Sequence, residues 1–575
     1  MYTLTFLNYY INIIDFDKDI VYTNYMPTIQ KKKIKGNYYW YIVESKRVNG
    51  KPRPIVLAYL GRIEDILSKL GGEKKIELSS RSYGAVASLW KTSIDNSVFD
   101  ILKKHLSSQE RDGLSVAQSL LIAAIHRVIE PASKNAFSDW AKNTTLPEIV
   151  GFESRRITSQ HFWDQMDTVT DKQIENIYND ITAMIINKHA FMPETLFFDS
   201  TNFFTFIDTH NEHCDIARRG HNKQKRNDLR QFGLAMLVSK DYFIPLGCEV
   251  YRGNINDSKM FREYLPGLLE RFKKVGIKSK DVTIVFDKGN NSETTFKEMD
   301  DEKLNFIASL PVAHHKEFLE MSADEFYDIN IGEKIIKCYK TQKMLWGKKR
   351  TIIIYISERL KEGQLNGVDK SLLKKMEELG QFKEKINLKS KMGTKKEIKN
   401  KVKRIIKGEY CEKIIDFDIK KYNGKVNFDY YINQYKYEYI AKNILGKRIL
   451  VTTRSDWNEK EIIEGYWGQS YIEKSFKQLK NPHVNAVRPQ YHWTDQKIKV
   501  HTFCCLIGFL LMQLMHKKVI ESGINISREK LIVKLSEIRK GRMVHMDAKN
   551  KKLKVEEYFE TSDELSTLIY KTINK

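Results

Sequence analysis

Residues 194–206 read ETLFFDSTNFFTF, in which an apolar run stops at Asp199. Residues 282–291, VTIVFDKGNN, repeat the arrangement with Asp287. Aspartate is depleted inside strands and costly to bury unpaired, so both runs predict buried strands that end at the carboxylate. In α/β sheets, sites are usually built at the carboxyl ends of strands. For either aspartate alone a cap or turn is the alternative, because turn-forming residues follow both.

A third acid lies in a helical stretch near the end of the chain. Residues 466–480 read YWGQSYIEKSFKQLK, and at about 100° per residue an apolar side forms from Ile472, Phe476 and Leu479. A polar stripe borders this side, so its central glutamate can be partly buried while it faces a cleft. A surface glutamate paired along the helix with lysines is the alternative. The stripe consists of Tyr466, Gln469, Glu473, Lys477 and Lys480.

The composition narrows the class of protein. The chain has 575 residues, of which 41% are hydrophobic, and its net charge is +24. So basic a chain typically binds a polyanion, most often nucleic acid, although an AT-rich genome would also enrich lysine. Six scattered cysteines without a C-x-x-C pair argue against disulfides and zinc and fit a reducing cytoplasm. The longest apolar run, 503–515, is too short to cross a bilayer and predicts a buried helix.

The sequence pattern divides the chain into segments. Residues 26–80 predict a small β-rich domain with a hairpin turn at Asn49-Gly50, and residues 81–190 predict a helical region. Strands and helices then alternate, which predicts an α/β core with a mixed sheet. The Lys-rich stretch 358–408 indicates a helix pair or a mobile arm. We expect the core in two parts, 191–320 and 456–530, with a β-rich insertion over 321–455 and a helical tail over 531–575.

Residues 466–480 resemble the third-acid helix of insertion-sequence transposases with a DDE catalytic triad. The signature of that branch is Tyr-x2-Arg-x3-Glu-x6-Lys; Tyr466, Glu473 and Lys480 match it, whereas Gln469 stands where it has arginine. The two aspartate runs look like the first- and second-aspartate strands, and similarity in order covers about residues 30 to 515. Family members begin near the position of Met26. We therefore expect residues 1–25 to be an upstream extension, with an additional native strand as the alternative.

The resemblance implies an RNase H-like core in which Asp199, Asp287 and Glu473 bind two Mg²⁺ or Mn²⁺ ions. Such an enzyme cuts transposon ends and joins the freed 3′-hydroxyl to target DNA by two-metal phosphoryl transfer. The implied partners are terminal inverted repeats and target DNA, with a homodimer when two ends are paired, at the nucleoid in a bacterial cytoplasm. A metal-dependent nuclease on the same core and a non-catalytic DNA-binding descendant are the alternatives.

Further DNA contacts are expected from the resemblance. Tyr466 and Lys480 suit contacts to phosphates, whereas Gln469 keeps a hydrogen-bond donor without a charge. Trp346, at the tip of a hairpin predicted over 330–357, would stack a displaced base, with packing on its own strands as the alternative. The helical region 81–190 would bind the transposon end. A basic loop, alternatively an ordinary solvated loop, and one more lysine complete the set: Arg218, Arg219, Lys223, Arg226 and Lys477.

Overall fold

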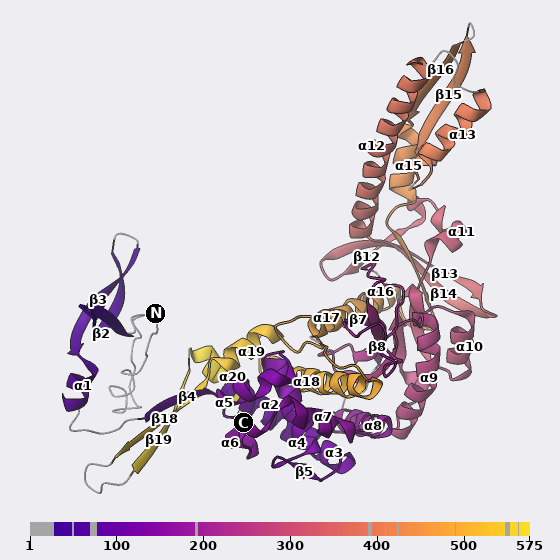
Figure 1. Cartoon of the computed structure of the whole chain (residues 1–575). Helices are drawn as coiled ribbons and strands as arrows, with labels where there is room; N and C mark the ends of the chain where they lie inside the picture. Colours follow the sequence, from indigo (N-terminus) through magenta and orange to yellow (C-terminus); the bar gives the residue numbers. More distant parts are fainter. Residues whose placement is uncertain are drawn as a thin grey trace. The chain divides into compact units, whose positions relative to one another are not determined.

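The computed structural model describes residues 28–48, 51–69, 77–189, 194–222, 224–388, 394–408, 410–422, 425–488, 490–546, 553–561 and 563–575 (Figure 1). The chain forms two compact units, one of residues 1–81 with 539–560 and one of residues 82–538 with 561–575. Three predictions lie outside the described residues: the extension over 1–25, the Asn49-Gly50 turn, and Lys223.

The first unit contains two three-stranded sheets and helix α1 (Ile63–Lys69). One sheet is antiparallel in the order β1 (Thr28–Ile34), β2 (Asn37–Val48), β3 (Lys51–Gly61). The other has the order β19 (Leu553–Glu560), β18 (Arg539–Met546), β4 (Glu77–Ser82). The prediction of a helical tail over 531–575 is therefore wrong for the residues that form β18 and β19. Apolar residues in β19 alternate with polar ones, at Leu553 and Val555, which is the strand period.

The second unit is built around a nine-stranded mixed sheet, which confirms the predicted α/β core. Its order is β12-β13-β14-β17-β11-β10-β7-β8-β9. Strands β7, β10 and β11 are parallel, whereas β8 and β9 follow β7 in antiparallel hairpins. The bounds are β7 Thr195–Thr205, β8 Arg230–Ser239, β9 Pro245–Arg252, β10 Thr283–Phe286, β11 Asn305–Leu310, β12 Tyr327–Ile331, β13 Lys334–Leu345, β14 Lys348–Ile356 and β17 Lys447–Thr452.

Helices cover both faces of this sheet. On one face the ring of Phe198 packs on Phe261 of α9 (Asp257–Lys274), with a centroid distance of 4.3 Å. On the other face Phe197 meets Tyr471 of α17 at 5.8 Å. Successive residues of β7 thus point to opposite helical layers, as the period of a strand requires. The helices of this part are α9, α10 (Glu293–Asp301), α11 (Lys316–Leu319), α16 (Glu459–Trp467) and α17 (Gln469–Leu479).

The helical region packs around α18 (Asp495–Glu521), which contacts α2, α4, α7 and α8 (Figure 1). This helix is long and apolar enough to cross a membrane, but 94% of its apolar window is buried inside the protein, as in a core helix. Ser115 and Thr170 begin α4 and α8 with capping boxes. The other elements are α2 Gly84–Asp95, α3 Val98–His105, β5 Glu110–Arg111, β6 Leu114–Ser115, α4 Val116–Ile129, α5 Phe137–Lys142, α6 Leu146–Val150, α7 Ser159–Asp167, α8 Asp171–Lys188, α19 Arg528–Ser536 and α20 Glu564–Asn574.

The segment 321–455 combines two structures. Its strands β12, β13, β14 and β17 extend the large sheet, and the residues between β14 and β17 have a hydrophobic core of their own. The helix pair predicted over 358–408 is confirmed as α12 and α13, so the expected β-rich character holds only in part. Val368, Leu372 and Leu379 form a buried stripe within the charged run, which explains the helix. The elements are α12 Glu358–Leu388, α13 Lys395–Ile406, α14 Cys411–Ile414, β15 Ile415–Tyr422, β16 Lys425–Ile432 and α15 Gln434–Asn443.

Candidate active site

Asp199 and Asp287 come from neighbouring parallel strands at matching positions. Val285 of β10 pairs with Phe197 of β7. Asp287 follows Val285 by two residues and Asp199 follows Phe197 by two residues. Because the strands are parallel, the register places the two aspartates side by side. Asp287 directly follows β10 and begins the 3-10 turn Lys288–Asn290, whereas β7 continues past Asp199 with partly exposed residues. The predicted position at the end of a strand is therefore confirmed for Asp287 and wrong for Asp199, which lies inside β7 because that strand continues to Thr205 beside β8.

The side chain of Asp199 lies on the sheet face that α17 covers. In a strand, residues 197, 199, 201 and 203 share a face. The ammonium of Lys480 donates a hydrogen bond to Thr201 Oγ1 and lies 5.4 Å from the centroid of the Phe203 ring. The Asp199 carboxylate also accepts a hydrogen bond from the backbone N–H of Ser200 at 2.8 Å. The helix that carries Glu473 therefore runs across the residues on either side of Asp199.

The helical stretch 466–480 is broken at Gly468, which differs from the continuous stripe that its spacing predicts. Helix α16 ends at Trp467 and α17 begins at Gln469. A Cβ atom at Gly468 would lie 2.2 Å from Cζ of Phe197, so only glycine allows this approach to β7. As a result Tyr466 and Gln469 are buried, each 7% exposed, while Glu473 and Lys477 are exposed.

Asp287, Tyr466, Gln469 and Glu473 line one cleft of about 910 Å³. The Tyr466 hydroxyl donates to Asp287 Oδ1 at 3.4 Å. Burial and the Asp287 carboxylate raise the pKa of Tyr466 to about 12, so the phenol stays protonated as a donor. The cleft thus combines the carboxylates of Asp287 and Glu473 with a hydroxyl donor, and Glu358 is a third carboxylate in its lining.

Basic side chains from distant segments also line this cleft, and sequence reasoning missed them. Lys288 directly follows Asp287, and that adjacency could have identified it. Nothing in the sequence links the other three basic residues to the acids, because they belong to elements far from the acids in the chain. They are Lys334, Arg359 and Arg448.

Gln469 connects α17 to the strand of Asp199. Its Nε2 donates to the carbonyl of Phe198 at 3.3 Å, one residue before the aspartate. Its Oε1 is buried and has no hydrogen-bond partner among the described residues. The residue that departs from the signature is therefore a neutral tie between helix and strand.

Asp199, Asp287 and Glu473 offer carboxylate oxygens, which are ligands that Mg²⁺ and Mn²⁺ prefer. Asp199 and Asp287 share a register position, and Glu473 lines the cleft with Asp287. Within the described residues, however, no three His, Cys, Asp or Glu side chains lie closely enough together to hold a metal ion. The structure therefore brings Asp287 and Glu473 to one cleft and Asp199 to the strand position beside Asp287, and Asp199 does not line that cleft.

A second, basic groove of about 520 Å³ lies along α17. It includes Lys477 and Lys480, both expected to contact DNA. Arg528 joins them from α19, and burial lowers the pKa of its guanidinium to about 10, which leaves it charged at neutral pH. Since Lys474 also lines the groove, four cationic side chains lie beside the helix of Glu473.

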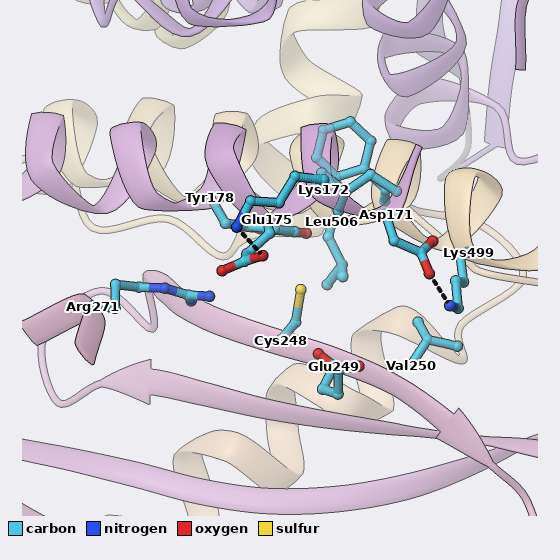
Figure 2. A pocket seen from close by; sticks show the side chains of 12 residues that line it. Asp171, Lys172, Glu175, Tyr178, Cys248, Glu249, Val250, Arg271, Lys499 and Leu506 are labelled. Carbon is cyan, nitrogen blue, oxygen red and sulfur yellow. Dashed lines mark hydrogen bonds and ion pairs between the residues drawn. The ribbon is translucent and has the colours of Figure 1, made fainter. Parts of the chain in front are cut away.

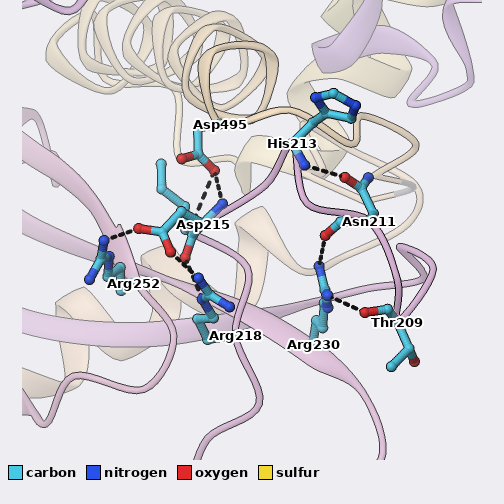
Figure 3. A network of polar contacts seen from close by, with 9 residues as sticks. Thr209, Asn211, His213, Asp215, Arg218, Arg230, Arg252 and Asp495 are labelled. Atoms are coloured by element: carbon cyan, nitrogen blue, oxygen red, sulfur yellow. Dashed lines mark hydrogen bonds and ion pairs between the residues drawn. The ribbon is translucent and has the colours of Figure 1, made fainter.

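The basic loop is held largely by its own acceptors. In Figure 3 the carboxylate of Asp215 lies between Arg218 and Arg252 and forms an ion pair with each. Arg226 makes two hydrogen bonds to Asp228, at 2.9 and 2.7 Å, and holds the pKa of that carboxyl at about 2. Arg219 donates to Thr209 Oγ1 at 3.1 Å. The expected role of these residues in DNA binding stays a prediction.

Trp346 lies at the tip of the β13–β14 hairpin with a positive φ of 50°. Its ring stacks on Phe296 of α10, with a centroid distance of 3.8 Å and an interplanar angle of 13°. The expected hairpin is confirmed, and the indole packs on a neighbouring helix. Its role in stacking a base stays a prediction.

A separate cavity of about 410 Å³ lies between α8, β9 and α18 (Figure 2). Its rim carries the ion pairs Lys172–Glu175 and Asp171–Lys499, and its floor includes Cys248. None of the three predicted acids lines it. It is thus distinct from the cleft described above.

Comparison with known proteins gives one informative match. Residues 27–82 match the profile described as IS1634 family transposase, N-terminal domain. No curated protein matches the chain. Among solved structures, the chain is similar to a piggyBac transposase in a cryo-EM synaptic complex with hairpin DNA. That similarity has 9% identity and a TM-score of 0.35 and covers 79% of this chain and 76% of that one. So low a TM-score does not establish a shared fold.

Proposed function

We propose that this chain, which carries the N-terminal domain of an insertion-sequence transposase, is a DDE transposase. It would cut transposon ends and join them to target DNA. The observation that carries this proposal is the register of the two aspartates. Asp199 and Asp287 lie side by side on parallel strands, and the helix that covers Asp199 also carries Glu473. The expected transposon ends, target DNA and a homodimer that pairs two ends belong to the same proposal.

The arrangement of β9, β8, β7, β10 and β11 supports an RNase H-like core. On one side of β7 lie β8 and β9, which are joined to it as successive antiparallel hairpins. On the other side lie β10 and β11, which are parallel to β7. This puts both aspartates near the middle of the sheet, where helices protect both faces. An acid on a covering helix can approach this position, and DNA would reach it through the cleft that Asp287 and Glu473 line.

The three carboxylates would hold Mg²⁺ or Mn²⁺, which supply charge stabilisation for the attacking and leaving oxygens of a phosphoryl transfer. Glu473 is exposed and can rotate toward the aspartates, because its anchor is the helix backbone. Gly468 and Gln469 fix that backbone against β7. Tyr466 keeps its proton and donates to Asp287, which holds this carboxylate in place.

The surrounding cations suit a DNA backbone that passes along α17. Lys288, Lys334, Arg359 and Arg448 line the cleft of the acids, and Lys477 and Lys480 line the neighbouring groove. Phosphate contacts of this kind position DNA without reading its sequence. The strand to be cut can therefore be held across α17, with the scissile phosphate at the carboxylates.

A joining assay tests this proposal. The full chain is incubated with Mg²⁺, a supercoiled plasmid, and a labelled duplex carrying the inverted repeat that flanks its gene. We expect label in plasmid-sized product. Cutting without joining would instead indicate a nuclease on the same core, and binding without cutting would indicate a non-catalytic descendant. Glu464→Gln is the matched control, because Glu464 is an exposed acid on α16 that does not line the cleft.

A further inference from the structure

A small pocket outside the cleft of Asp287 and Glu473 gathers basic groups. Its volume is about 300 Å³, and it is formed where the turn before α5, helix α7, the segment after α17 and helix α18 meet. Its polar lining consists chiefly of Lys134, His492 and His501, with hydroxyl and amide groups beside them. None of the described lining residues is Asp or Glu. The other polar groups belong to Ser133, Asn135, Ser159, Trp163 and Tyr491.

The hydrogen bonds fix which atoms in this pocket carry protons. His501 Nε2 lies 2.9 Å from the carbonyl of Val487, so it donates, and Nδ1 accepts from the Lys134 ammonium at 3.0 Å. His492 Nε2 lies 3.2 Å from the same ammonium and must also accept. The proton of His492 is therefore on Nδ1, which is buried and has no hydrogen-bond partner among the described residues.

The protonation states leave one net positive charge in the pocket. Burial lowers the pKa of both imidazoles well below the usual value, so they are neutral. Burial also lowers the pKa of Lys134 to about 8, which leaves the ammonium charged at neutral pH. The ammonium has three N–H groups and two acceptors among the described residues. One N–H of Lys134 and the Nδ1–H of His492 thus remain as donors.

The neighbouring cations Lys497 and Arg127 differ from Lys134 because a carboxylate or backbone carbonyls accept their hydrogen bonds. Lys497 forms an ion pair with Asp167. The guanidinium of Arg127 donates to the carbonyls of Ala132, Ala486 and Arg488. Lys134 alone among these three cations relies on two neutral imidazoles, so the pocket is complementary to an anion.

We propose that this pocket binds one phosphodiester group of the DNA backbone, held by Lys134, His492 Nδ1–H and the Ser133 and Ser159 hydroxyls. The pocket offers hydrogen-bond donors and a positive charge, which exclude a metal cation as the ligand and fit a monoanionic oxyanion. At the rim Tyr491 is 67% exposed, so a polymer can continue past the bound phosphate along an aromatic side chain. The inference rests on the proposed function, since that function supplies DNA.

The test measures DNA affinity of the full chain by fluorescence anisotropy over a range of salt concentrations. Each neutralised phosphate contributes about 0.9 to the slope of log affinity against log salt. Lys134→Gln should lower the slope by about that amount and weaken binding several-fold at low salt. Lys142→Gln is the matched control, because Lys142 is an exposed lysine on α5 that pairs with Asp139 outside the pocket. It should bind DNA like the unaltered protein.

A second variant and a second ligand keep the test decisive if Lys134→Gln folds poorly. His492→Phe keeps a ring of similar shape beside Trp163 but removes the free N–H. It should lower affinity for DNA at all salt concentrations. Inorganic phosphate should raise the Tm of the unaltered protein above that in chloride of equal ionic strength, and should not do so in either variant.

Three results would overturn the inference. Unchanged salt slopes and affinities in both variants would show that the pocket contacts no DNA phosphate. Phosphate stabilisation with unchanged DNA binding would assign the pocket to a free anion. If the unaltered protein binds no DNA at any salt concentration, the proposed function itself fails, which is distinguishable from the failure of the pocket alone.

Discussion

Replacing Gly468 by alanine tests whether the junction of α16 and α17 sets the position of Glu473. The backbone there has φ −60° and ψ −14°, which alanine adopts without strain, so the effect is purely steric. The new Cβ would lie 2.2 Å from Cζ and 2.6 Å from Cε1 of Phe197. Overpacking of this kind costs about 1–3 kcal/mol. Because Phe197 stands two residues before Asp199, relief of the clash separates the helix from the strand of the aspartate.

We expect Gly468→Ala to lower the Tm by about 2–12 °C, since 1 kcal/mol corresponds to about 2–4 °C in domains of 150–250 residues. The rate of DNA cutting should fall far more, by about 100-fold, because a displacement of about 1 Å can cost that much. Scanning fluorimetry and a labelled cleavage assay measure the two effects.

Gly267→Ala is the matched control for this substitution. Gly267 is exposed in helix α9, and a Cβ atom added there would meet open space. Alanine should stabilise that helix by up to about 1 kcal/mol and leave cutting unchanged. If Gly468→Ala melts and cuts like the control, the close approach to Phe197 does not position Glu473, and the role of Gly468 given above is wrong.

Arg350→Met should lower the free energy of unfolding by about 3 kcal/mol in a urea titration, because among the described residues it leaves the Asp300 side chain, which is 7% exposed, with only the Lys348 ammonium at 3.5 Å; an unchanged midpoint would contradict this. Gln469→Met should slow cutting while costing about 1 kcal/mol of stability, since it removes the tie to β7; equal cutting rates would show that the tie is dispensable. Binding of sulfate, whose charge is constant, should weaken as the pH rises through about 8, where Lys134 loses its proton, and Lys134→Gln should lack this dependence. The titratable or charged groups that face this ammonium are His492, His501, Arg127, Cys504 and Cys505.

The two strands that carry the aspartates were predictable from sequence because their signal is local, although only Asp287 stands at a strand end and β7 continues past Asp199. Short apolar runs bounded by polar residues are typical of buried strands, and the two runs do become the adjacent strands β7 and β10. The order of the sheet was not predictable, because pairing between distant strands leaves no periodic trace in either one. The same holds for Arg359 and Arg448, which reach the cleft from segments with no sequence link to the acids.

In the stretch that carries Glu473, helical periodicity predicted one continuous stripe, whereas the structure has two helices. Helical spacing put Tyr466 and Gln469 on one stripe with the glutamate, but Gly468 ends one helix and starts the next. A glycine within a helical pattern can mark a close contact with another element, and here Phe197 is that contact. The strands of residues 539–560 were missed for a related reason. Their partner β4 lies more than 400 residues earlier in the chain.

The most direct test of the proposed active site compares three conservative variants in one cleavage assay: Asp199→Asn, Asp287→Asn and Glu473→Gln. Each keeps the shape of the side chain and removes the charge. All three should bind the labelled end like the unaltered protein, melt at a similar temperature and lose cutting in Mg²⁺, while Glu464→Gln cuts normally. Normal cutting by any of the three, with Glu473→Gln the most informative, would contradict the assignment of these acids as one catalytic set.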